Sequence, residues 1–168
     1  IIEAVLEDMQ VKQEIWQQLE GICRDDVIFA TNTSALPISE MASIFADPGR
    51  MIGMHFFNPA HRMQLLEVIC AAKTSDQTLA TTVAFSRAIK KIPIVVNDGP
   101  GFYVSRQLGG LMGGAIYLTA DGVDGAAIES AFTDFGMPMG PATLADLTGI
   151  DINYHVNKTF EKRLGERY

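Results

Sequence analysis

His55 and Glu67 are the residues whose types and spacing best suit proton-transfer chemistry. His55 lies near the end of the apolar run MIGMHF at residues 51–56, and Glu67 follows twelve residues later inside a second apolar run, LLEVIC, at residues 65–70. Neighbouring strands would bring the two side chains together, and a carboxylate bonded to one ring nitrogen leaves the other nitrogen to accept a proton. A carboxylate in an apolar run also needs a partner, because an unpaired buried charge is costly. These features alone leave open a histidine that is simply packed in the core.

Two further polar groups, Ser34 and Asn58, follow apolar runs. Ser34 ends the stretch TNTS, and Asn58 lies just beyond His55, before Pro59. An open α/β sheet binds ligands at the carboxyl ends of its strands, where both groups fall if the runs are strands. Ser and Asn also cap helices and order turns, so a local structural role stays open for both. His61, in the polar connection AHRMQ, is expected to be exposed.

Composition argues against several classes of function. The formal net charge of −7 disfavours sequence-independent binding of nucleic acid, which needs a basic surface. No apolar run approaches the roughly 20 residues of a membrane span, and the first residues lack the features of a signal peptide. Cys23 and Cys70 are expected to be reduced, buried thiols, and the absence of CxxC, HxxxH and HExxH spacings predicts no metal site. The expected location is the cytoplasm, or an organelle matrix in a eukaryote.

Apolar runs alternate with helical patterns in the first part of the chain. Near-continuous apolar strands between helices favour an α/β fold with a mainly parallel sheet. The turn-rich segment NDGPGF marks a boundary near residues 98–101, and only helical patterns follow, so the predicted domains are residues 1–98 and an all-helical region, 99–168. The glycines of GGLMGG are expected to allow close helix packing rather than to bind phosphate. The predicted strands are 1–6, 27–32, 51–56, 65–70 and 92–97, and the helices between them are 8–23, 37–45 and 75–91.

Five stretches of the chain carry a resemblance to a known family. In chain order they are IEAVLEDMQVKQE, FATNTSALPI, GMHFFNPAHRMQLLEVI, NDGPGFYVSRQL and GMPMGPATLADLTGID, and together they resemble the 3-hydroxyacyl-CoA dehydrogenase family. NPAHRM and the ending GERY resemble the dehydrogenase part of a multifunctional fatty-acid oxidation complex α subunit. The resemblance implies the C-terminal half of a Rossmann-like NAD-binding domain, followed by an incomplete helical domain for substrate binding and dimerisation. The start at Ile1, inside a predicted strand, also suggests a piece of a longer protein.

The resemblance implies a reaction and a role for each candidate residue. The family oxidises an L-3-hydroxyacyl-CoA to the 3-ketoacyl-CoA and passes the hydride to NAD. His55 would be the general base that removes the 3-hydroxyl proton, and Glu67 would orient it. Ser34 would hydrogen-bond the substrate oxygen near the nicotinamide, and Asn58 would position cofactor and substrate. These four residues are expected to lie close together.

Four other residues match family positions at the same site. Ala4, Glu7 and Lys12, in EAVLEDMQVK, would line the NAD site, and Lys12 is the cation suited to a ribose or phosphate oxygen. The alternative for Lys12 is a solvated helix residue. Ser105, in PGFYVSRQL, stands where many members have Asn, so its contribution to the active site is expected to be weaker. No GxGxxG phosphate loop occurs in the chain, so the chain alone is expected to show little or no turnover.

The resemblance also implies partners, while two other functions stay open. The expected partners are the 3-hydroxyacyl-CoA substrate and either a second copy, in a homodimer, or a thiolase subunit, in a complex. One alternative is a non-catalytic assembly module of the same fold, which the intact His55, Glu67, Ser34 and Asn58 argue against. The other is a dehydrogenase of the same architecture that acts on a small hydroxy acid without CoA.

Overall fold

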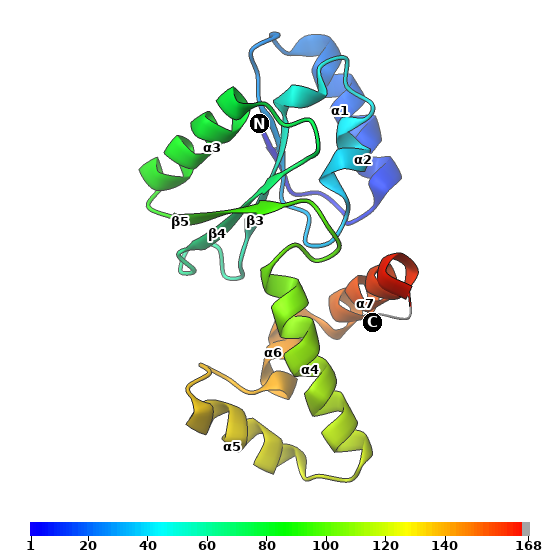
Figure 1. The fold of residues 1–168 in the computed structure, drawn as a ribbon, viewed down its shortest axis with the longest axis vertical. Coiled ribbons are helices and arrows are strands. Elements are labelled where there is room, and N and C mark those ends of the chain that lie inside the picture. Colours follow the sequence, from blue (N-terminus) through cyan, green and yellow to red (C-terminus); the bar gives the residue numbers. More distant parts are fainter. Residues whose placement is uncertain (166–168) are drawn as a thin grey trace. The chain divides into compact units, whose positions relative to one another are not determined.

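The chain divides into two compact units in the computed structural model. The first is Ile1–Phe102, and the second, which is helical, starts at Tyr103 (Figure 1). The structure describes residues 1–165, without the side chains of Ile152, His155 and Thr159. Most of the ending GERY therefore lies outside the described residues.

A five-stranded sheet forms the centre of the first unit. The strands follow one another across the sheet in chain order, and all neighbours pair in parallel except β3 and β4, which are antiparallel. The expected mainly parallel α/β sheet is confirmed. The antiparallel pair is joined by a short connection that leaves no room for a crossover helix. The strands are β1 (Ile2–Glu3), β2 (Phe29–Thr31), β3 (Met51–Phe56), β4 (Leu65–Cys70) and β5 (Ile92–Asn97).

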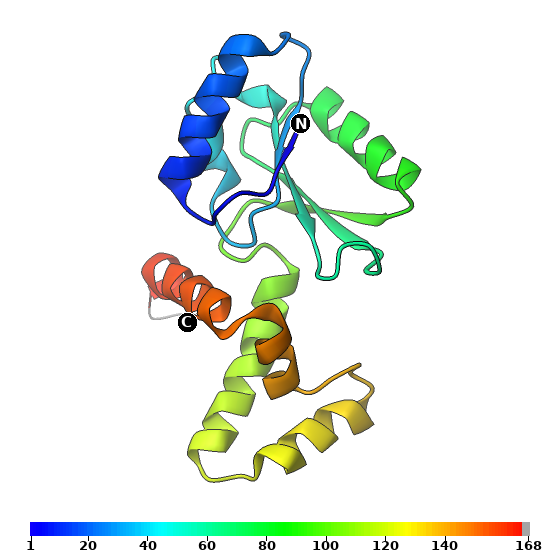
Figure 2. The same cartoon turned by 180° about the vertical axis from the view of Figure 1, so that it is seen from behind.

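Helices cover both faces of this sheet. Helices α1 and α2 lie on one side and α3 on the other, as the two opposite views show (Figures 1 and 2). Alternation along the strands sends Phe29 to a core with Trp16 of α1, whereas the adjacent Ala30 joins a second core that contacts Leu79 of α3. The elements are α1 (Met9–Ile22), α2 (Ile38–Ala42), a 3₁₀ turn (Pro48–Arg50) and α3 (Asp76–Ala88).

The first strand is shorter than the predicted run 1–6. The Glu3 carboxylate accepts a hydrogen bond from the backbone nitrogen of Val5 at 2.6 Å, so the chain turns directly after β1. Asp8 then caps α1 by accepting a bond from Val11 N at 2.9 Å. The bond between the Glu3 side chain and Val5 N thus ends β1 at Glu3.

Cys23 and Cys70 are free thiols, but the expectation that they are buried is wrong. Both are half-buried, because each lies at the end of an element rather than inside it: Cys23 follows α1 and Cys70 ends β4. Burial, and secondarily the charge of Asp76, raises the pKa of the Cys70 thiol. This keeps the thiol protonated and unreactive.

Up to residue 165, where the description of the structure ends, the second unit consists of four helices, as the patterns after NDGPGF predict. The GGLMGG stretch lies inside the first of them, where a side chain at Gly109 would touch the ring of Phe160 in the last. The other three glycines have open space around them, so the predicted close packing holds at Gly109 and is wrong for Gly110, Gly113 and Gly114. Among the described residues, no helix combines the length and the apolar character needed to cross a membrane. The helices are α4 (Val104–Ala120), α5 (Gly125–Phe135), α6 (Pro141–Thr148) and α7 (Ile150–Leu164).

Candidate active site

The structure brings His55 and Glu67 into direct contact. The two residues are register partners on the antiparallel strands β3 and β4. His55 Nδ1 lies 2.8 Å from Glu67 Oε2, with the histidine 6% exposed and the glutamate 0% exposed. An ionised carboxylate only accepts, so Nδ1 carries the proton of the neutral ring and Nε2 is its basic nitrogen. The pair has the geometry of a proton acceptor and the group that orients it.

Two aromatic rings pack against the imidazole of His55. The ring of Phe57 lies 4.6 Å from it between centroids, and the ring of Phe102 lies 5.9 Å from it. Phe102 is buried, and it comes from the turn after β5, far along the chain from β3. Neither phenylalanine was predicted as a site residue. The apolar pair FF beside His55 is the signal that points to Phe57, but nothing local points to Phe102.

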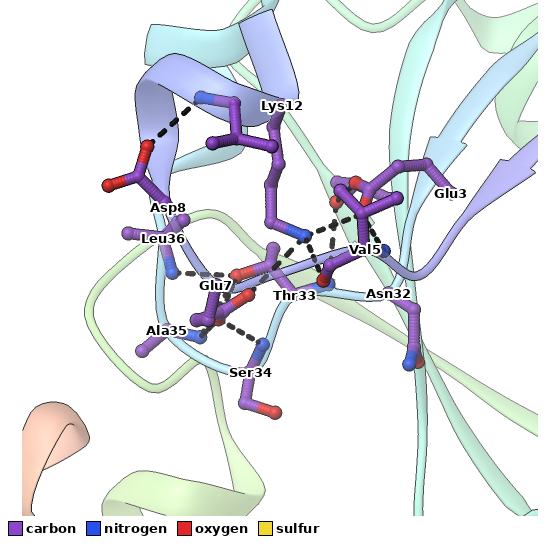
Figure 3. A network of polar contacts seen from close by, with 12 residues as sticks. Glu3, Val5, Glu7, Asp8, Lys12, Asn32, Thr33, Ser34, Ala35 and Leu36 are labelled. Atoms are coloured by element: carbon purple, nitrogen blue, oxygen red, sulfur yellow. Dashed lines mark hydrogen bonds and ion pairs between the residues drawn. The ribbon is translucent and has the colours of Figure 1, made fainter. Parts of the chain in front are cut away.

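Ser34 lies in the loop after β2, and Glu7 holds this loop. Glu7 Oε1 accepts hydrogen bonds from Ser34 N at 2.9 Å, from Ala35 N at 3.3 Å and from the hydroxyl of Thr33. Figure 3 shows these bonds converging on Glu7, whereas the Ser34 side chain points away from them. Glu7 thus fixes the backbone of the loop and leaves the Ser34 hydroxyl directed elsewhere.

Lys12 is buried between two carboxylates. Its Nζ lies 2.6 Å from Glu3 Oε1 and 3.4 Å from Glu7 Oε2, and the side chain is only 1% exposed. The second oxygen of Glu3 accepts a bond from the Thr31 hydroxyl at 2.7 Å. The alternative of a solvated Lys12 is therefore wrong, since the carboxylates compensate its buried charge. Its contact with a cofactor oxygen stays a prediction.

Glu3 and Asn32 are polar residues of this region that the sequence reasoning missed. Glu3 is a carboxylate within an apolar strand, as Glu67 is. The pattern that indicated Glu67 could therefore have indicated Glu3 as well. Asn32 lies within TNTS, and its Oδ1 accepts a bond from Phe56 N at 2.9 Å. This bond ties the loop after β2 to the end of β3, one residue after His55. The loop that carries Ser34 is thus held on both sides.

The remaining predicted residues lie at the surface or in the other unit. Asn58 is exposed in the turn after β3 and is joined to Pro59 by a cis peptide bond. Ala4 is exposed after β1, and His61 is exposed as expected. Ser105 is half-buried in the first turn of α4, in the helical unit. Among the described side chains, no group of three or more His, Cys, Asp or Glu is placed to hold a metal ion.

Models of one family match both units of the chain. Residues 1–99 match the NAD binding domain of 3-hydroxyacyl-CoA dehydrogenase, and residues 101–168 match its C-terminal domain. The first match includes His55, Glu67, Ser34 and the residues that hold the Ser34 loop. The two models meet at the turn where the structure separates the units.

Curated relatives and solved structures agree with these models. A fatty acid oxidation complex subunit alpha from Shewanella is 46% identical over all of this chain, which spans only 24% of that relative's length. The (S)-3-hydroxybutyryl-CoA dehydrogenase PaaH1 from Ralstonia eutropha superimposes with a TM-score of 0.93 at 35% identity, over 98% of this chain and 59% of that one. The 3-hydroxybutyryl-CoA dehydrogenase from Escherichia coli gives a TM-score of 0.89 at 32% identity, over 96% of this chain and 34% of that one. The chain belongs to the 3-hydroxyacyl-CoA dehydrogenase family.

Proposed function

We propose that this chain is part of an enzyme that oxidises L-3-hydroxyacyl-CoA to 3-ketoacyl-CoA, with NAD as the hydride acceptor, in fatty-acid oxidation. The observation that carries the proposal is the buried pair of His55 and Glu67, 2.8 Å apart, in a chain whose two units match this family. The relatives named as 3-hydroxybutyryl-CoA dehydrogenases and as a subunit of a fatty acid oxidation complex support the substrate class.

His55 is the general base in this proposal. Nε2 takes the proton of the 3-hydroxyl group, because Nδ1 donates to Glu67. As the O–H bond breaks, the C3–H bond also breaks, its electron pair leaves with the hydrogen, and the C3–O bond becomes a carbonyl. Glu67 stabilises the imidazolium that results. Ser34 bonds the substrate oxygen, and Asn58 and Ser105 are further polar contacts.

The residues around Glu7 fit NAD as a ligand rich in hydroxyl groups. The Glu7 side chain is 38% exposed although it holds the loop of Ser34, so part of the carboxylate faces outward. It lies where the parallel strands β1 and β2 end, which is where such sheets bind nucleotides. Glu7, Ala4 and Lys12 would line the cofactor, with Lys12 supplying positive charge behind the carboxylate. When bound, NAD supplies the acceptor for the hydride.

Substitution of His55 in the full-length protein tests the proposal. His55→Ala should lower kcat for 3-hydroxybutyryl-CoA by about 100- to 10,000-fold, the usual contribution of a general base. His61→Ala, in the exposed turn, is the matched control and should keep normal turnover. Wild-type activity of His55→Ala would refute the assigned base.

The choice of substrate separates the rival functions. The full-length protein should oxidise 3-hydroxybutyryl-CoA but not free 3-hydroxybutyrate. Oxidation of the free acid alone would favour a dehydrogenase of small hydroxy acids. Oxidation of neither, with the fold intact, would favour a non-catalytic assembly module.

The 168 residues alone should show little or no turnover with acetoacetyl-CoA and NADH. They contain no GxGxxG loop, and a dinucleotide held without such a loop loses both affinity and orientation. Steady-state assays of the purified chain measure this directly, and a robust rate would contradict it. The parent protein should also associate with itself or with a thiolase subunit. The Shewanella relatives are named as a subunit of a complex, which supports an association of some kind. Mass photometry of the purified protein tests that point.

A further inference from the structure

The turn at residues 98–102, with the sequence DGPGF, contacts both sides of the candidate site. Its first residue, Asp98, bonds to the start of α2, and its last, Phe102, packs on His55. We propose that Asp98 and Phe102 are positioning residues, which fix the Ser34 loop and the His55 ring without touching substrate. This inference rests on the proposed function.

Asp98 caps a helix that lacks a cap of its own. The residue before α2 is Pro37, whose side chain makes no capping bond. Asp98 Oδ1 accepts from Ile38 N at 3.2 Å and Oδ2 accepts from Ser39 N at 2.8 Å, and Asp98 N donates to Cys70 O at 3.1 Å. The carboxylate therefore fastens the start of α2 to the ends of β4 and β5.

The start of α2 is also the end of the loop that carries Ser34. Glu7 and Asn32 hold the first part of this loop, from Asn32 to Ala35, through hydrogen bonds. Asp98 holds its far end, at Ile38. The position of the Ser34 hydroxyl is thus set from both ends, and the fastening at the α2 end comes from a residue sixty positions further along the chain.

Phe102 occupies a backbone conformation that suits glycine better. Its φ is +50°, and it follows Gly101 at +67°, so two successive left-handed residues reverse the chain. A non-glycine residue persists there only when its surroundings determine it strongly. The side chain is 4% exposed and belongs to the same buried cluster as Ile38. A glycine would fit this backbone conformation but would lack the ring that packs on His55.

The bonds of Asp98 to α2 and the packing of Phe102 on His55 act together, because both come from one turn. The ring of His55 packs against both Phe57 and Phe102, which restricts its rotation and helps to keep Nδ1 directed at Glu67. The same turn that supplies Phe102 supplies Asp98. A displacement of the turn therefore disturbs the base and the Ser34 loop together, and small displacements of reacting groups reduce rates strongly.

Kinetics of the full-length protein test the proposal. Asp98→Asn replaces one acceptor oxygen by an amide nitrogen, so one of the two amides of α2 loses its acceptor and the other keeps only an uncharged one. Phe102→Leu removes the ring but keeps apolar bulk. Each should lower kcat by about 10- to 100-fold while KM changes less than about twofold, because the displaced groups, His55 and Ser34, act at the reacting oxygen and not on the rest of the substrate. Asp26→Asn, at an exposed ion pair, and Phe85→Leu, at a half-exposed ring, are matched controls and should leave kcat unchanged. Phe102→Tyr keeps the ring and should restore most of the rate.

Hydrogen–deuterium exchange of the same variants gives a readout that does not depend on turnover. Asp98→Asn should speed exchange in peptides that cover residues 33–41 and leave α3 as protected as in the wild type. Equal loss of protection in both segments would mean that Asp98 has only a general structural role. Unchanged kcat in both variants, in a protein where His55→Ala is inactive, would overturn this inference alone. Activity of His55→Ala would instead overturn the proposed base.

Discussion

The two units of this chain differ in what they bury. The sheet unit buries a large apolar core around Trp16 and also charged groups, Lys12 and Glu67 among them. The helical unit buries few apolar side chains among its described residues, Ile128 and Phe160 being the large ones, and it leaves Phe135 85% exposed and Tyr117 75% exposed. The sheet unit therefore positions its site residues through its own packing. The same kind of substitution should have opposite or unequal effects in the two units.

The largest difference between the units in the loss of unfolding free energy is expected for substitutions of aromatic residues. Trp16 is fully buried, with its ring 5.5 Å from that of Phe29 and 6.2 Å from that of Phe45 between centroids. Trp16→Ala should lower the free energy of unfolding by about 3–5 kcal/mol, through lost contacts and a residual cavity. Phe135→Ala should change it by less than about 0.5 kcal/mol. Denaturant titrations followed by circular dichroism measure both, and equal losses would contradict the contrast.

The next largest difference in unfolding free energy is expected for substitutions of lysines that form ion pairs. Lys12→Met leaves the buried Glu3 carboxylate without its cation and should cost about 3 kcal/mol of unfolding free energy. Lys158→Met removes the exposed pair with Glu161 and should have no measurable effect. Adding Glu3→Leu to Lys12→Met should recover part of the loss, because the buried unpaired charge is then removed and the other partner of Lys12, Glu7, is 38% exposed. A double variant no more stable than Lys12→Met would show that the pair itself is not the cause.

Contacts between neighbouring runs were predictable from the sequence, and contacts between distant ones were not. The strands at 51–56, 65–70 and 92–97 have the predicted bounds, because each is a short, mainly apolar run that begins directly after a polar residue. The meeting of His55 and Glu67 follows from the short connection between their strands. The bond between Asp98 and Ser39 joins segments 59 residues apart, so no local pattern indicates it. It depends on how α2 packs against the sheet.

Glycines should also behave differently in the two units. A Cβ at Gly53, in the middle of β3, would lie 2.8 Å from the Cβ and Cδ1 atoms of Ile69 on the neighbouring strand. Gly53→Ala should therefore cost about 1–3 kcal/mol of unfolding free energy by overpacking. Gly113 lies inside α4 with open space around it, and Gly113→Ala should instead add about 0.5–1 kcal/mol by favouring the helix. Thermal unfolding of the two variants gives the signs, and a shared sign would contradict the prediction.

The smallest effect on stability is expected at a half-buried carboxylate of the helical unit, Glu129. It accepts bonds from Ala142 N at 2.8 Å and from the Thr143 hydroxyl at 2.5 Å, and so caps the start of α6 from α5. The bond from Thr143 is the largest cause that lowers the pKa of Glu129 below its ordinary value of 4.5. A carboxyl whose pKa is lower in the folded state stabilises the fold when ionised.

The stabilising contribution of Glu129 should therefore depend on pH in one direction. It is fully present above pH 4.5, the ordinary pKa, and is lost as pH falls below that value through the lower pKa of the folded state. Glu129→Gln cannot ionise, so its unfolding midpoint should decline less between pH 5 and pH 3 than that of the wild type. Thr143→Val removes the largest cause of the lowered pKa and should give an intermediate slope. If all three proteins lose stability in parallel on acidification, the bonds of Glu129 do not couple its ionisation to the fold of the helical unit.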